Sequence, residues 1–145
     1  MIWGGFASDG TRVVTRVNEK LNAIGYVEVL QEHLLPLDLP NRGMLMQQDN
    51  APAHKAATTM RFLRKHNIET LDWPPQSPDL NLIENMWGYL KEKLESLEIA
   101  TFAELEATVI REWANIPAEV VNNIIDSMPR RMAAVIAARG ANTKY

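Results

Sequence analysis

The chain has 145 residues, a net charge of −3 at pH 7 and no cysteine. Its length suffices for one domain with a sizeable core, and 46% hydrophobic and 23% charged residues are ordinary for a globular protein. This composition excludes disulfides, thiolate metal sites and a cysteine nucleophile, and it argues against a membrane span and a stand-alone basic nucleic-acid binder.

The first third predicts a hairpin and then a helix. Residues 1–6 and 11–17 have the composition of strands, and Asp9-Gly10 between them is a favourable hairpin turn. An amphipathic helix is expected over residues 21–35, where Pro36 ends it.

A strand–helix–strand unit is expected next. Gly43 precedes a short apolar run over residues 44–48, which predicts an interior strand of an α/β sheet. A helix is expected over residues 54–66, and a further strand over residues 68–73, stopped by Pro74.

The remaining sequence predicts helices only. The longest is expected over residues 78–98, and Thr101 with Glu104 forms a capping box ahead of the next. Pro117 and Pro129 each suit a first helical position. The order of elements indicates an α/β fold with a C-terminal helical tail.

Asp49, in QQDNAPAH, is the first candidate site residue. It follows the expected interior strand, and ligands of open α/β sheets bind where strands end. The structural alternative is that Asp49 or Asn50 caps the next helix or forms an Asx-turn. His54 fits a helix start and a functional role equally well.

Glu84 is the second candidate acid. At about 100° per residue it falls on the shoulder of the apolar stripe, beside Leu80 and Trp87, so we expect it to lean toward the core. One alternative is a capping box of Asn81 with Glu84. A helix that starts after Ser77 would instead leave Glu84 free for other work.

Two chemistries are therefore open. The carboxylates of Asp49 and Glu84 are hard oxygen ligands that suit Mg²⁺ or Mn²⁺ in phosphoryl transfer. Two basic segments are either solvated helix faces or contacts to phosphates. The candidate DNA contacts are Arg61, Arg64, Lys65, Arg130 and Arg131.

The strings QQDNAPAH and LDWPPQSPDLNLIENMWGYLK resemble the catalytic core of mariner-type (Tc/mariner) DDE transposases, which have an RNase H-like fold. Asp49 and Glu84 are separated by 34 residues, the interval found in one large branch of that family. MIWGGF resembles the family's second core strand and SMPRRMAAVIAARGANTKY its C-terminal end, so the likeness runs the whole length of the chain.

The resemblance implies a role for each matching residue. Asp49 corresponds to the second catalytic aspartate and Glu84 to the third acid, both as ligands of Mg²⁺ or Mn²⁺, of which complete relatives bind two ions. It implies metal-dependent DNA cleavage and strand transfer in the nucleus. Leu82 departs from the pattern, since many members have proline there. The motif-supporting residues are Asn50, His54, Asp79, Asn81 and Asn85.

The front of the chain departs most from the family pattern. The regions that carry the first catalytic aspartate and the helix-turn-helix domains have no counterpart, so we expect the frame to begin at an internal methionine. We expect an RNase H-like core that lacks its first strand at residues 1–98, and a helical extension of the same domain at residues 99–145. The two strands that would flank the missing strand would then pair directly, pair with another chain, or leave backbone groups unpaired.

With two of the acids, one weakly held ion is expected, and the chain alone is expected to be catalytically incomplete. The alternatives are a non-catalytic module that binds DNA or assembles with itself or a full-length transposase, and a decayed element fragment without function.

Overall fold

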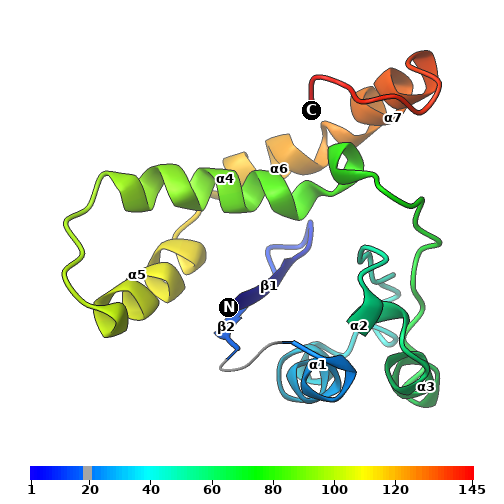
Figure 1. Cartoon of the computed structure of the whole chain (residues 1–145), viewed down its shortest axis with the longest axis horizontal. Helices are drawn as coiled ribbons and strands as arrows, with labels where there is room; N and C mark the ends of the chain where they lie inside the picture. Colours follow the sequence, from blue (N-terminus) through cyan, green and yellow to red (C-terminus); the bar gives the residue numbers. More distant parts are fainter. Residues whose placement is uncertain (18–20) are drawn as a thin grey trace. The chain divides into compact units, whose positions relative to one another are not determined.

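The computed structural model describes residues 1–17 and 21–145. The chain forms two compact units, whose helices and strands are labelled in Figure 1. Each unit has its own buried side chains. The division of the domain into residues 1–98 and 99–145 stays a prediction. In the structure the N-terminal hairpin groups with the C-terminal helices. The units comprise Met1 with Val17–Ser77, and Ile2–Arg16 with Pro78–Tyr145.

The predicted N-terminal hairpin is confirmed and belongs to the second unit. Strands β1 (Ile2–Phe6) and β2 (Arg12–Arg16) pair antiparallel, with Ile2 opposite Arg16. In the turn, Gly10 has a φ of +90°, which glycine adopts without steric cost. The Asp9 carboxylate accepts the Thr11 N–H at 3.0 Å, so the turn closes as an Asx-type turn.

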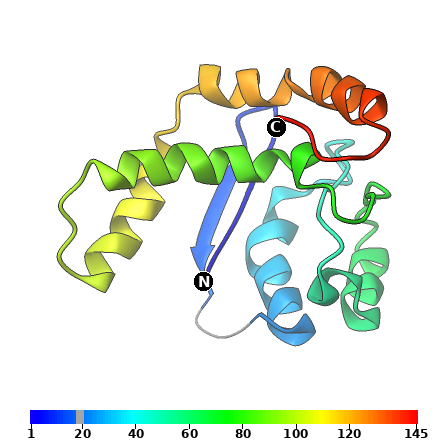
Figure 2. The same ribbon diagram turned by 45° about the horizontal axis from the view of Figure 1, so that its top comes forward.

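Helices make up the rest of the second unit. The predicted capping box is confirmed in part: the Thr101 hydroxyl accepts the Glu104 N–H at 3.1 Å, while the Glu104 carboxylate accepts the N–H of Ala100 at 3.0 Å. Helix α6 runs alongside α4 (Figure 2). The elements are a 3₁₀ turn (Pro78–Leu80), α4 (Leu82–Glu95), α5 (Phe102–Ala114), α6 (Ala118–Ile125) and α7 (Met128–Ala137).

The core of the second unit lies between α4, α5, α6 and the hairpin. Trp113 is 1% exposed, and its ring centroid is 4.5 Å from that of Trp87, which is partly buried and packs against the core. Arg12 of β2 donates to the carbonyls of Ala114, at 3.1 Å, and Ile116, which satisfies acceptors at the end of α5. The buried cluster is Met86, Leu90, Val109, Trp113, Ile116 and Val121.

The first unit begins with α1 (Ala23–Val29), which Asn22 caps by accepting the N–H groups of Ile24 and Gly25. The helical path continues as a π-turn (Leu30–Leu34) and a 3₁₀ turn (Leu35–Leu37), so the expected helix over residues 21–35 forms with an irregular end. The buried side chains here are Tyr26, Val29, Leu30, Leu34, Leu39, Met46, Thr59, Leu63 and Ile68.

The helix expected over residues 54–66 is divided into α2 (Pro52–Lys55) and α3 (Ala57–Lys65). Ala56 has a ψ of 143°, which is extended backbone and interrupts the hydrogen-bond ladder. The Thr59 hydroxyl compensates by donating to the Ala53 carbonyl at 2.7 Å. This side-chain hydrogen bond, which helical periodicity does not reveal, stabilises the break.

The prediction of extended strands over residues 44–48 and 68–73 is wrong. Among the described residues, these segments meet in one parallel bridge between Met46 and Thr70. The Met46 N–H donates to the Glu69 carbonyl at 2.8 Å, and the Leu71 N–H donates to the Met46 carbonyl at 2.9 Å. Two backbone hydrogen bonds on either side of one residue make a bridge and not a ladder.

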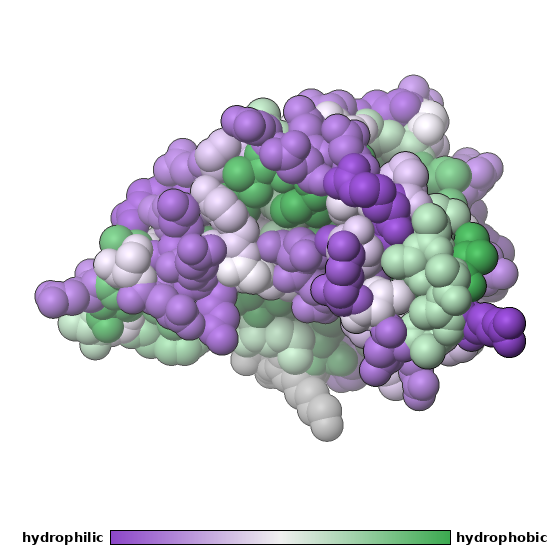
Figure 3. Space-filling model, turned by 90° about the horizontal axis from the view of Figure 1, so that it is seen from above, coloured by the Kyte–Doolittle hydropathy of each residue, from purple (hydrophilic) through white to green (hydrophobic). Residues whose placement is uncertain are grey.

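The face drawn in Figure 3 is mostly hydrophilic, with apolar side chains reaching the surface in several places. Phe102 and Ile136 are among the exposed apolar residues.

Within residues 1–17 and 21–145, no helix combines the length and apolar character needed to cross a bilayer.

Replacement of Gly4 should destabilise the second unit. A Cβ at this position would lie 2.7 Å from Cη2 of Trp87 and 3.2 Å from Cζ2 of Trp113, closer than packed atoms allow. We expect Gly4→Ala to lower the free energy of unfolding by about 1–3 kcal/mol, measured by chemical denaturation. The control is Gly5→Ala in the same strand, whose Cβ would stand 3.4 Å from Val13. Equal stability of both variants would contradict this packing.

Candidate functional site

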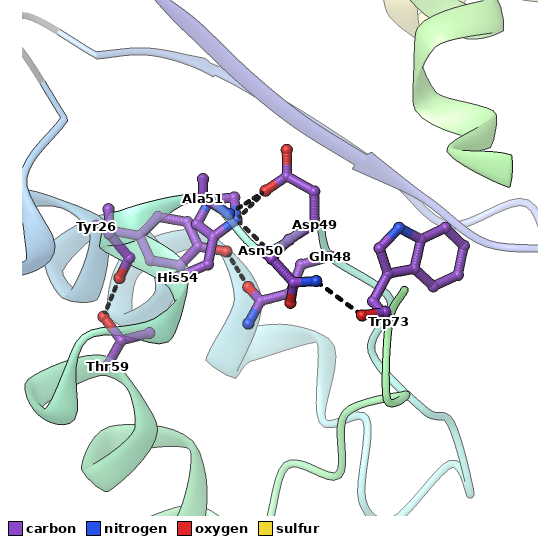
Figure 4. Close-up of polar contacts among 9 residues, drawn as sticks. Tyr26, Gln48, Asp49, Asn50, Ala51, His54, Thr59 and Trp73 are labelled. Atoms are coloured by element: carbon purple, nitrogen blue, oxygen red, sulfur yellow. Dashed lines mark hydrogen bonds and ion pairs between the residues drawn. The ribbon is translucent and has the colours of Figure 1, made fainter. Parts of the chain in front are cut away.

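Asp49 lies in the loop between the Met46 bridge and α2, with a side chain 50% exposed. Its Oδ1 accepts the Ala51 N–H at 2.9 Å, so the Asx-turn considered from the sequence does form. The same oxygen lies 2.7 Å from His54 Nδ1, while Oδ2 points away from both groups (Figure 4). Asp49 therefore has a structural role through one oxygen and presents the other.

His54 is built into this loop from α2. Its Nδ1 lies 3.2 Å from the Asp49 carbonyl as well as 2.7 Å from the carboxylate. Its ring centroid is 4.3 Å from that of Tyr26, and the Tyr26 hydroxyl donates to Gln48 Oε1 at 2.6 Å. Sequence reasoning missed Tyr26 and Gln48, because the spacing of residues in the 47–54 motif carries no signal of a ring from α1.

Asn50 connects the loop to the next segment. Its side-chain amide donates to the Trp73 carbonyl at 2.7 Å, just before the proline pair (Figure 4). This asparagine thus supports the motif by holding two loops together.

Glu84 lies in the first turn of α4 and is exposed, so the expectation that it leans toward the core is wrong. The apolar stripe of α4 is centred on Met86 and Leu90, on the other side of the helix. Leu80, from which the stripe was extended, belongs to the separate 3₁₀ turn. An exposed carboxylate here has no desolvation cost to offset and is accessible to a cation.

Neither of the two helix starts considered for Glu84, a capping box with Asn81 or a helix that begins after Ser77, forms at α4. Asn81 occupies the N-cap position and is buried, but its side chain makes no capping hydrogen bond. The capping box of Asn81 with Glu84 is therefore not formed. Pro78 opens its own 3₁₀ turn instead of α4, and Asn85 is half-buried.

Asp79 anchors the C-terminal segment to the loop before α4. Its Oδ2 accepts the Thr143 hydroxyl at 2.6 Å and the Thr143 N–H at 2.7 Å. The hydrogen bond from the Thr143 hydroxyl and, to a lesser extent, that from its N–H hold the pKa of the Asp79 carboxyl below its ordinary value of 3.8. The role of this motif residue is thus to fix the chain that leads into α4.

The burial of Arg131, at 4% exposed, argues against its predicted contact with DNA. Its guanidinium donates to Ser127 Oγ at 2.7 Å and to the Asp79 carbonyl at 2.8 Å, and it lies over the Tyr145 ring. The run of cations in the sequence concealed this internal role. The other four predicted contacts are exposed: Arg61, Arg64, Lys65 and Arg130.

The two candidate acids fit a hard divalent cation in chemistry but are few in number. Both carboxylates are exposed, and oxygen donors of this kind suit Mg²⁺ or Mn²⁺. Asp49 belongs to the first unit and Glu84 to the second. Across the described parts of the chain, no three side chains of the histidine, cysteine, aspartate or glutamate type cluster as a metal site.

Comparison with known proteins identifies relatives. The profile of the DDE superfamily endonucleases matches residues 1–106. The Tc1 transposase of Caenorhabditis elegans is 37% identical over 151 aligned positions, which cover the whole chain and 54% of that protein. The Tcb1 transposase of Caenorhabditis briggsae is 36% identical with the same coverage. The chain thus spans about half the length of the curated relatives it matches.

Solved structures of similar fold include mariner transposases. The catalytic domain of the Mos1 transposase, solved with raltegravir and Mn, superposes with a TM-score of 0.85 at 20% identity, covering 99% of this chain and 76% of that one. A Mos1 paired-end complex with Mn gives a TM-score of 0.79 at 21% identity, covering 92% and 41%. The likeness confirms the predicted RNase H-like fold.

Acid should release the C-terminal segment from Asp79. Because the folded pKa is lowered, the contribution of this contact is fully present above pH 3.8 and is lost as the pH falls through the folded pKa. An NMR titration should show the Thr143 amide shifting with a midpoint below 3.8, and Asp79→Asn should abolish that transition. A midpoint at or above 3.8, or the same transition in the variant, would contradict this assignment.

Proposed function

The chain belongs to the DDE superfamily of endonucleases, and we propose on this basis that it forms part of the catalytic core of a Tc1/mariner-type transposase. Such a core would cut DNA and join the freed 3′ end to a new site. The observation that carries the proposal is the pair of exposed acids, Asp49 and Glu84, with 34 residues between them, within matching motifs. One lies in the loop after the Met46 bridge, and the other lies in the first turn of a long helix.

In this proposal Asp49, through Oδ2, and Glu84 hold Mg²⁺ or Mn²⁺. The bound ion would supply Lewis-acid activation at the phosphate and stabilise the charge that develops there. The protein's own contribution is to keep both carboxylates exposed and oriented. Support comes from the Asx-turn at Asp49 and from the Asp79 anchor before Glu84.

Two carboxylates are fewer than a two-metal site uses. Magnesium retains most of its waters and binds weakly to sparse ligands, so the 145-residue chain should hold one ion weakly. Cutting by the chain alone should accordingly be minimal. A full transposase, or assembly with another copy, is the setting in which we expect these two acids to act.

We assign the DNA contact to the basic face of α3. Arg61, Arg64 and Lys65 occupy positions i, i+3 and i+4, which share one face of a helix, and all three are exposed. Arg130 at the start of α7 is a further exposed cation. Cations in this arrangement attract the phosphate backbone regardless of base sequence. A protein that acts on chromosomal DNA would work in the nucleus.

Manganese binding should depend on both acids. We expect Asp49→Asn and Glu84→Gln each to weaken Mn²⁺ binding by more than about tenfold, because each removes an anionic ligand. Electron paramagnetic resonance of free Mn²⁺ measures the affinity. The matched controls are Asp72→Asn and Glu92→Gln, which remove exposed acids from the corresponding units and should leave the affinity unchanged.

Equal affinities in all five proteins would contradict the proposed ligand set. Nicking of supercoiled plasmid in Mn²⁺ separates binding from cutting. Nicking by the wild type above the level of Asp49→Asn and Glu84→Gln would show that two carboxylates suffice for cleavage, against the expected incompleteness.

Replacement of the α3 cations should weaken DNA binding. A variant with Arg61, Arg64 and Lys65 all changed to Ala should bind duplex DNA less tightly, with a salt slope shallower by up to about 3, because up to three phosphate contacts are lost. Fluorescence anisotropy over a salt series measures both quantities.

A charge-matched control removes Lys91, Lys93 and Arg111, which are exposed on α4 and α5. If both triple variants lose the same affinity and slope, the effect is one of net charge and the assignment to α3 is wrong.

A further inference from the structure

The Asp49 carboxylate is held asymmetrically. Oδ1 accepts the Ala51 N–H at 2.9 Å and lies 2.7 Å from His54 Nδ1, while Oδ2 points away (Figure 4). A carboxylate fixed by a single backbone N–H could still rotate about its Cβ–Cγ bond. The second contact, from a ring on α2, restricts that rotation.

The hydrogen on His54 can be assigned from its neighbours. Both groups near Nδ1 are oxygens of Asp49, the carboxylate at 2.7 Å and the carbonyl at 3.2 Å. Oδ1 already accepts the Ala51 N–H and a carbonyl oxygen only accepts hydrogen bonds, so we assign the hydrogen to Nδ1, which donates. His54 is therefore a donor aimed at Asp49, whichever state its other nitrogen adopts.

The ring of His54 is itself supported from α1. Its centroid lies 4.3 Å from that of Tyr26, which is 1% exposed, and the side chain of His54 is only 17% exposed. The Tyr26 hydroxyl donates at 2.6 Å to Gln48, the residue before Asp49. The buried tyrosine thus contacts both the histidine ring and the side chain of the residue before the acid.

We propose that His54, supported by Tyr26, is a positioning residue that occupies Oδ1 of Asp49 and leaves Oδ2 as the single oxygen presented to a divalent cation. The metal part of this inference rests on the proposed function. A second-layer donor of this kind orients a ligand before the ion arrives, and its loss typically weakens metal affinity about 10- to 100-fold. Asp49 would then be a one-oxygen ligand.

Two substitutions separate the donor from the ring. His54→Phe keeps a ring against Tyr26 but cannot donate, whereas His54→Asn places an amide N–H near the position of Nδ1 without the ring. In the 145-residue chain, we expect His54→Phe to weaken Mn²⁺ binding about tenfold or more and His54→Asn to restore most of it. Electron paramagnetic resonance with Mn²⁺ as the probe measures this.

A metal-free readout tests the orientation itself. The Ala51 N–H reports on Oδ1, so His54→Phe should shift its NMR signal and speed its hydrogen exchange, while His54→Asn should resemble the wild type. An unchanged Ala51 signal in His54→Phe, or an equal change in both variants, would overturn the positioning role. Tyr26→Phe, which removes only the hydroxyl, should give a smaller change of the same sign if His54→Phe does not fold.

Failure of the proposed function would look different. If the wild type shows no Asp49-dependent Mn²⁺ binding, the metal role is overturned, and the Ala51 amide still decides whether His54 orients the carboxylate.

Discussion

The close approach of strand β1 to two packed indoles organises the second unit. Gly4 has no side chain, and a Cβ there would stand 2.7 Å from the ring of Trp87. Trp87 lies on Trp113, which is almost completely buried. This contact sets the rotation of α4, so that Met86 and Leu90 face the core and Glu84 faces solvent. The exposure of the acid is thus a consequence of packing on the other side of its helix.

Asp49 is placed by a different kind of interaction. No regular strand or long helix carries it, and short-range hydrogen bonds define its orientation instead. The Asx-turn and the His54 contact both use Oδ1. A capping or turn role and a ligand role are therefore compatible in one carboxylate, since they use different oxygens. The turn role and the ligand role of Asp49, which the sequence presented as alternatives, do not exclude each other.

Local signals in the sequence were reliable where a few neighbouring residues determine the structure. The Asp9-Gly10 turn and the Thr101 cap both form, because their partners lie within three residues. The family motifs indicated the RNase H-like fold, which no periodicity alone would have done. Prolines and capping residues also placed most helix starts within a few positions.

Features that depend on distant residues were not predictable. Arg131 is buried because Asp79 and Tyr145 surround it, and neither lies near it in the sequence. Tyr26 reaches the Asp49 loop from another helix for the same reason. The expected strands shrink to one bridge, since ladder formation depends on partners that sequence pattern does not reveal.

The proposed function requires divalent-ion binding at Asp49 and at Glu84. The most direct measurement is paramagnetic broadening of amide NMR signals at substoichiometric Mn²⁺, which falls steeply with distance from the ion. We expect the signals around Asp49 and those around Glu84 to broaden first, ahead of those around Asp72 and Glu92. Broadening at only one of the two acids, or equally at all exposed acids, would contradict the proposed function.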